Sequence, residues 1–107
     1  MADTYISLQQ AEPTGSEVAL YTCPGGTSFV GSSLIICNEN ATPVTIDVRM
    51  AVADAADDPK QYLYQSTLMP ANSTLCLTAG LTMTAGDVLY VNAAGGVSFQ
   101  IGGVQIA

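Results

Sequence analysis

The sequence predicts an all-β protein, an antiparallel β-sandwich or jelly roll of about eight short strands. Two observations favour this fold class. Short segments alternate between apolar and polar residues with a period of two, and none repeats with the period of a helix. Groups of Gly, Pro, Asn and Ser separate these segments at spacings of about a dozen residues, as in sandwiches and jelly rolls.

The N-terminal residues differ from the rest of the chain. Residues 1–10 begin as a polar tail, and we expect them to form an arm in which Tyr5, Ile6 and Leu8 make a short strand. Residues 11–107 would form a single sandwich domain. The arm is a candidate for pairing with the sheet edge of a neighbouring subunit.

Three strands are predicted in the first half of the domain. Residues 17–22 alternate, a Pro-Gly-Gly break follows, and residues 29–38 form a long strand. Residues 34–36 are apolar on both faces, so we expect this strand to be buried on both sides or covered by a partner. Residues 44–52 alternate most cleanly, which places Val52 on the same face as Val48.

An acidic segment and further strands follow. Residues 53–60 should form an exposed loop, and residues 61–69 a strand with Tyr62 and Tyr64 on one face. Residues 73–81 alternate as one strand.

The last two strands are predicted at residues 88–92 and 97–106, joined by a tight hairpin at residues 93–96. Gly102 and Gly103 interrupt the final strand, which indicates a β-bulge.

Composition limits the partners of this chain. Of its 107 residues, 49% are hydrophobic and only 10% are charged, with a formal net charge of −7. Arg49 and Lys60 are the only basic residues, so no basic patch exists that would neutralise nucleic acid phosphates or an anionic membrane. The first ten residues lack the features of a secretory signal. A surface with so few charges suits contact with other proteins.

The usual catalytic groups are missing. The absence of histidine removes the common general base and the commonest zinc ligand, so we expect no enzyme activity. Cys23, Cys37 and Cys76 lack CxxC spacing and should be free thiols, with a Cys23–Cys37 bridge as the alternative. Cys23 lies in a turn and would be partly exposed, whereas the other two lie in strands and would be small core residues. We expect no cofactor.

Asp54, Asp57 and Asp58 form the only carboxylate cluster. They would either hold a calcium ion or belong to a solvated acidic loop, and the absence of EF-hand spacing favours the loop. Tyr62 and Tyr64 lie beside this loop, as core or rim residues or as anchors for a partner.

Several segments of the chain form an ordered set: LYTCPGGT at residues 20–27, SSLIICN at 32–38, KQYLY at 60–64, PANST at 70–74, LTMTAGDVL at 81–89, VSF at 97–99 and GVQI at 103–106. Together they resemble small virion structural proteins of tailed bacteriophages, including phages of cyanobacteria. The first two are similar to the family patterns Leu-Tyr-Thr-x-Pro-x-Gly-Thr and Ser-Ser-Ile-Val-Val-Cys-Asn. The chain departs from the family at residues 49–53, where the family often has Arg-Pro-x-Gly and this loop is more acidic.

The resemblance implies a capsid cement, or decoration, protein. Such a protein would bind the outside of the phage head and clamp neighbouring major capsid subunits, as a homotrimer assembled in the cytoplasm of the bacterial host. The family's motifs mark turns and core, so they imply no catalytic residues. The partner contacts that we expect are Tyr5, Ile6, Leu8, Tyr62 and Tyr64.

Three other classes remain open from the sequence. A tail, neck, baseplate or fibre-associated virion protein is the first alternative, and it would differ from a cement protein in its copy number per particle. A carbohydrate-binding module would need a platform of exposed aromatic residues, which the absence of Trp disfavours. A metal-dependent enzyme would need a cation at the three aspartates of the acidic loop.

Overall fold

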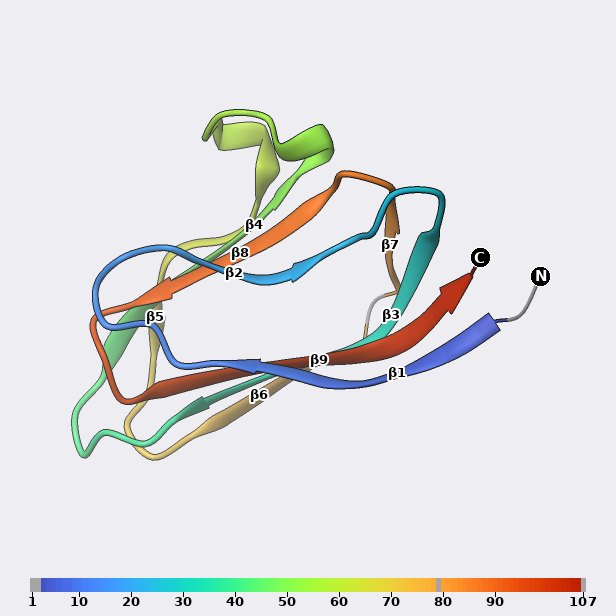
Figure 1. Ribbon diagram of the computed structural model, residues 1–107. Coiled ribbons are helices and arrows are strands. Elements are labelled where there is room, and N and C mark those ends of the chain that lie inside the picture. Colours follow the sequence, from blue (N-terminus) through green and yellow to red (C-terminus); the bar gives the residue numbers. More distant parts are fainter. Residues whose placement is uncertain (1–2, 79, 107) are drawn as a thin grey trace.

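The computed structural model describes the backbone of residues 3–78 and 80–106, and the side chains of these ranges from residue 9 onward. Two antiparallel sheets pack face to face, which confirms the predicted all-β sandwich (Figure 1). The elements are β1 (Asp3–Ala11), β2 (Val18–Thr22), β3 (Ser28–Asn38), β4 (Val44–Ala51), the 3-10 turns η1 (Val52–Asp54) and η2 (Pro59–Gln61), β5 (Tyr62–Met69), β6 (Thr74–Leu77), β7 (Leu81–Thr84), β8 (Val88–Ala93) and β9 (Val97–Ile106).

The order of the strands is that of a jelly roll. Sheet A has the order β1-β9-β3-β6, with β7 also paired to β3, and sheet B has the order β2-β8-β4-β5. The antiparallel pairs β4–β5, β3–β6, β2–β8 and β1–β9 are nested, so the chain doubles back as one long hairpin with its tip between β4 and β5. Rolling this hairpin places successive pairs alternately in sheets B and A. The ends of the chain therefore lie side by side, with Asp3 opposite Ile106.

The hydrophobic core fills the space between the sheets. Phe29 and Tyr21 stack at a ring separation of 4.4 Å, which joins β3 of sheet A to β2 of sheet B. Burying each large apolar side chain contributes about 1.5–3 kcal/mol relative to its exposure. The core members with no more than 1% of their surface exposed include Phe29, Leu34, Ile36, Phe99 and Ile101 from sheet A and Ile46, Val48, Leu89 and Val91 from sheet B.

Asn38 joins the loops at one end of the sandwich. Its side chain is fully buried, and its amide nitrogen donates to the carbonyls of Thr42, Met69 and Pro70 at 3.2, 3.2 and 3.0 Å. Its oxygen accepts from the backbone and side-chain nitrogens of Asn40 at 2.9 and 3.0 Å. One side chain thereby fixes both the β3–β4 and the β5–β6 connections, since buried carbonyls require donors.

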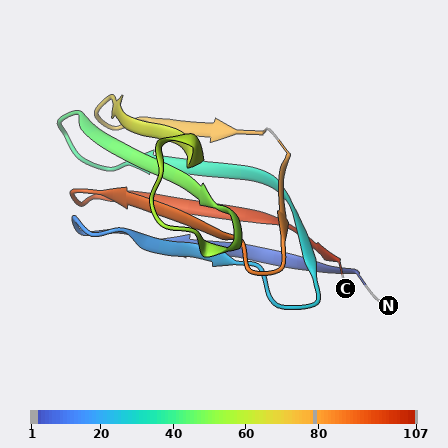
Figure 2. The ribbon, with the colours of Figure 1, turned by 90° about the horizontal axis from the view of Figure 1, so that it is seen from above.

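Asp87 joins the loops at the other end. One carboxylate oxygen accepts the backbone N–H of Ala53 at 2.8 Å, and the other accepts the N–H and hydroxyl of Thr84 at 2.9 and 3.3 Å. The backbone of Cys23 is hydrogen-bonded to both Gly86 and Asp87. The β2–β3, β4–β5 and β7–β8 connections therefore meet at this end, and Figure 2 shows the β4–β5 connection folded back over the strands.

Gly103 allows the closest contact between strands in sheet A. A Cβ atom at this position would collide with the backbone oxygen of Val30 and lie 2.8 Å from the Cα of Gly31. The registers of both β1 and β3 shift opposite Gly102 and Gly103. The irregularity was predicted correctly, but the extra residues lie in the partner strands, Ser32 of β3 among them, rather than in β9 itself.

Three predictions about the strands were wrong. The predicted strand 73–81 is shorter than expected: β6 covers only residues 74–77, and a separate strand, β7, begins at Leu81 and continues to Thr84. The two strands pair with different parts of β3 and bring the count to nine. Residues 93–96 do not form a hairpin, because β8 belongs to sheet B and β9 to sheet A. Val52 leaves the core face and is 63% exposed, because the chain turns into η1 after Ala51.

The apolar segment 34–36 is fully buried on one face only. Leu34 and Ile36 are fully buried, while Ile35 on the opposite face is half-buried, so β3 faces the core on one side only.

Residues 3–11, which include most of the arm expected at residues 1–10, form β1 and pair with β9 of the same chain. The division into an arm and a domain stays a prediction.

Candidate functional site

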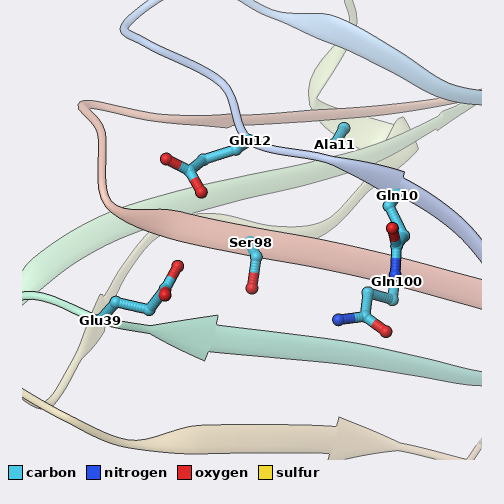
Figure 3. Close-up of a pocket in the computed structure, with 6 residues that line it drawn as sticks. All are labelled: Gln10, Ala11, Glu12, Glu39, Ser98 and Gln100. Atoms are coloured by element: carbon cyan, nitrogen blue, oxygen red, sulfur yellow. The ribbon is translucent and has the colours of Figure 1, made fainter.

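A shallow polar hollow of about 390 Å³ lies on the outer face of sheet A. Its lining comes from the end of β1, the start of the β3–β4 connection and β9, and Figure 3 shows the side chain of Gln10 extending from β1 toward Gln100 of β9. Glu12, Glu39 and Ser98 complete the polar lining. The hollow offers carboxylates, amides and a hydroxyl, and none of its lining residues is aromatic.

A second polar group surrounds the side chain of Arg49, on the outer face of sheet B. The guanidinium donates to both carboxylate oxygens of Glu17 at 2.6 Å and to Gln61 at 2.7 Å. It also lies 4.3 Å from the ring centre of Tyr90. The hydrogen bonds to Glu17 raise the pKa of Arg49 further, against the opposing effect of burial.

This arrangement leaves little free positive charge. Arg49 is only 6% exposed and its charge is compensated by Glu17, so Lys60 is the single exposed base of the chain. The bidentate geometry requires an arginine, since lysine carries a single point of charge. We interpret the group as a structural link between β2, β4 and the β4–β5 connection rather than as a reactive site.

The acidic loop does not assemble a metal site in the part of the chain that the structure describes. Asp54 accepts the hydroxyl of Tyr90 at 2.6 Å, and Asp57 accepts that of Tyr62 at 2.9 Å. Asp58 instead accepts the backbone N–H of Lys60 and begins η2 with a capping box. Within the described residues no three side chains of the ligand types His, Cys, Asp and Glu converge.

The hydrogen bonds to Asp57 and Asp54 raise the pKa values of the Tyr62 and Tyr90 hydroxyls, because each carboxylate favours the protonated phenol. Both hydroxyls therefore remain neutral donors in the physiological range. The loop that carries the aspartates is thus held onto β5 and β8 by two tyrosines.

The predicted partner contacts fall into two groups. Tyr62 and Tyr64 are half-buried on β5, where Tyr62 lies beside the acidic loop as expected. They do not share a face as predicted, because a bulge between them turns Tyr64 toward the core, against which it packs. The side chains of Tyr5, Ile6 and Leu8 lie outside the described residues, although their backbone belongs to β1. The two groups are on strands of different sheets, so they are not brought together within one chain.

The cysteines have the reverse of their predicted burial. Cys23 is 1% exposed, and its thiol contacts the carbonyl and hydroxyl of Thr27 at 3.6 Å, because the β7–β8 turn covers it. Cys37 is partly exposed and Cys76 fully exposed, since both point away from the core on sheet A. All three are free thiols.

Sequence reasoning missed the two groups that organise the polar interior. The alternation of residues 44–52 puts Arg49 on the face opposite Val48 but predicts no ion pair, and Asn38 ends the strand predicted at residues 29–38 with no role for its side chain. A signal existed for Arg49, because it is one of only two bases in a chain with nine acids and interrupts an apolar strand. No local pattern marks Asn38, since its partners come from residues 40–42 and 69–70.

Comparison with known proteins gives a likeness to a solved structure and none to a family or curated protein. No model of a protein family and no curated protein matches the sequence. A solved structure described as a pentameric capsid protein isolated from metagenomic phage sequences aligns over 92% of this chain and 60% of its own, with 15% identity and a TM-score of 0.38. This chain thus spans about three-fifths of that protein's length. No helix among the described residues is long and apolar enough to cross a membrane.

Proposed function

We propose that this protein is a non-enzymatic capsid cement, or decoration, protein of a tailed bacteriophage. It binds the outside of the head and clamps neighbouring major capsid subunits, and it acts as a homotrimer. Assembly takes place in the bacterial cytoplasm, and the protein ends on the capsid surface. The proposal starts from the ordered sequence resemblance to small phage virion proteins and rests on what the resembling segments do in the fold.

One observation carries the proposal. The segments that resemble the phage proteins contain the residues that close the rolled sandwich. SSLIICN ends in Asn38, which links the loops of one end, and LTMTAGDVL contains Asp87, which links those of the other. GVQI begins with Gly103, where two strands of sheet A come closest. The resemblance therefore follows the architecture of the domain and not a reactive site, as expected for a protein whose task is structural.

The surface is compatible with this role. The protein has nine acids and two bases, and Arg49 is neutralised inside the chain. The exposed charge is therefore almost entirely negative and would complement a basic capsid surface. The rest of the surface is mainly uncharged, so a partner would meet few charged groups that must lose their hydration.

The contacts to the capsid stay proposals. We assign them to Tyr62 and Tyr64 beside the acidic loop and to the arm with Tyr5, Ile6 and Leu8. Tyr62→Ala should weaken binding of the purified protein to heads that lack it by about tenfold, because tyrosines dominate many interfaces. Gln65→Ala changes an exposed residue of the same strand and serves as the control. Equal binding of both variants in a cosedimentation assay would remove Tyr62 from the contact.

The experiment that tests the function is the copy number and location of the protein in purified particles. Quantitative mass spectrometry of separated heads and tails should find it in the head fraction, on the order of hundreds of copies, since a cement protein repeats with the symmetry of the shell. About a dozen copies in the tail fraction would instead support the alternative, a tail, neck, baseplate or fibre-associated virion protein. Absence from both fractions would refute a virion role.

A further inference from the structure

The sandwich is open along one side, between the edge strands β5 and β6. These strands border sheets B and A, and a crevice of about 280 Å³ lies between them. Figure 2 shows both strands along one margin of the molecule, opposite β1 and β2. The lining is mainly apolar, and it consists of Ile46, Thr67, Leu68, Met69, Pro70, Ser73, Thr74 and Leu75.

This edge lacks the usual protection against association. Soluble proteins protect edge strands with charges, prolines, bulges or a covering element. Residues 61–86 contain no charged residue at all, and neither edge strand contains a proline. Bulges distort β5 near Leu63 and Ser66, but residues 67–69 beside the crevice pair regularly with residues 44–46 of β4.

Apolar side chains are exposed along the same edge. Leu68 is 65% exposed and Leu63 is 41% exposed, which makes β5 the source of two of the five large apolar side chains that the described residues expose. On β6, Leu75 and Leu77 are half-buried. Leu75 and Leu77 also pack against the core. We call β5, β6 and the crevice between them the neutral edge.

We infer that the neutral edge is the surface through which copies of this chain associate with one another. The charge distribution selects a second copy as the occupant. A chain with a net charge of −7 repels its own copies over most of its surface, and the opposite margin carries Glu12 directly after β1. At the neutral edge a second copy brings no like charge from either strand and covers exposed leucines.

The neutral edge is large enough for a stable interface between two copies only if both β5 and β6 are covered. A stable interface covers about 800 Å² per partner, which is roughly one-seventh of the 5524 Å² that this chain exposes. The crevice alone is too small for this, so β5 and β6 must both be covered. The inference names the interface of the homotrimer in the proposed function but does not depend on the virion role. A monomer in solution would remove both the interface and the trimer, whereas absence of the protein from purified particles would remove only the virion role.

The test compares two variants that add the same charge. Leu68→Glu places a carboxylate on the neutral edge, and Val52→Glu places one on η1, at a side chain that is almost as exposed, 63% against 65%. Both positions are too open for the change to disturb the core, which thermal unfolding would verify. Sedimentation velocity at about 1–100 µM should show the unmodified chain and Val52→Glu as oligomers, and Leu68→Glu with a dissociation constant raised about tenfold or more.

The dependence on salt gives a second readout. Raising the salt from about 0.02 M to about 0.5 M should strengthen the association, because it screens repulsion between acidic copies without weakening apolar contacts. A monomeric unmodified chain at about 100 µM, or equal dissociation constants for the two variants, would overturn the inference. So would an association that salt weakens, since that would indicate an interface built on opposite charges.

Discussion

Asp87→Asn should destabilise the fold by removing the charge that fixes one end of the sandwich. The carboxylate is 6% exposed and receives three hydrogen bonds, from the N–H groups of Ala53 and Thr84 and the hydroxyl of Thr84. Burial by itself would raise the pKa of Asp87, but these donors outweigh it and lower the pKa below its usual value. The native state therefore prefers the ionised form.

The expected loss of stability follows from the hydrogen bonds that the substitution changes. An asparagine oxygen can still accept from Ala53, but its NH₂ group then faces the N–H of Thr84, so one charge-assisted bond is lost and one buried donor is left unpaired. The two effects together cost about 2–4 kcal/mol. For a domain of this size the midpoint of thermal unfolding should fall by about 10–15 °C.

Urea unfolding at neutral pH, followed by circular dichroism, would measure this loss. Asp57→Asn makes the same chemical change at an exposed position and should alter the free energy of unfolding by less than about 0.5 kcal/mol. The reasoning would be refuted if the two variants unfolded at the same urea concentration with the same slope.

The pH dependence of the same pair gives an independent check. A carboxyl group with a lowered pKa contributes stability above its unfolded pKa of about 3.9, and this contribution is lost as the pH falls through the lower pKa of the folded state. The difference in unfolding free energy between the unmodified protein and Asp87→Asn should therefore be constant near neutral pH and shrink below about pH 4. A difference that stays constant down to about pH 2 would contradict the role of the charge.

Three further predictions concern residues that the fold depends on. Gly103→Ala should destabilise the protein by about 3 kcal/mol or more, since the new Cβ meets backbone atoms that cannot turn away, whereas Gly25→Ala has no atom within 4 Å and should be neutral in the same urea assay. Asn38→Ala should cost about 3 kcal/mol because it leaves buried carbonyls without donors, and a loss below about 1 kcal/mol would show that water replaces the amide. In the folded protein a thiol reagent should modify Cys76 rapidly and Cys23 only on unfolding, and rapid modification of the double variant Cys37→Ser/Cys76→Ser, which keeps only Cys23, would show that Cys23 is accessible.

Local alternation predicted the strands better than it predicted their partners. The period-two pattern located β2, β3, β4, β5, β8 and β9 closely, because a strand with one buried face must alternate whatever lies across the sheet. The same pattern continues through residues 73–81, although β6 ends at Leu77 and β7 only begins at Leu81, since alternation does not show where a strand stops pairing. Turn-forming residues at 93–96 predicted a reversal correctly, but a reversal does not specify whether the flanking strands pair or cross between sheets.

The sequence by itself determined the fold class, the scarcity of charge and the lack of histidine, because these depend only on composition and on the spacing of apolar residues. The tertiary structure alone decided that Cys23 is buried, that Arg49 is neutralised by Glu17, and that Asn38 and Asp87 close the two ends of the roll. Each of these depends on a contact between residues distant in the chain, which rolling the nested hairpin brings together. The neutral edge has the same origin: its uncharged sequence is visible at once, but only the strand order shows that residues 61–86 border the open side of the sandwich.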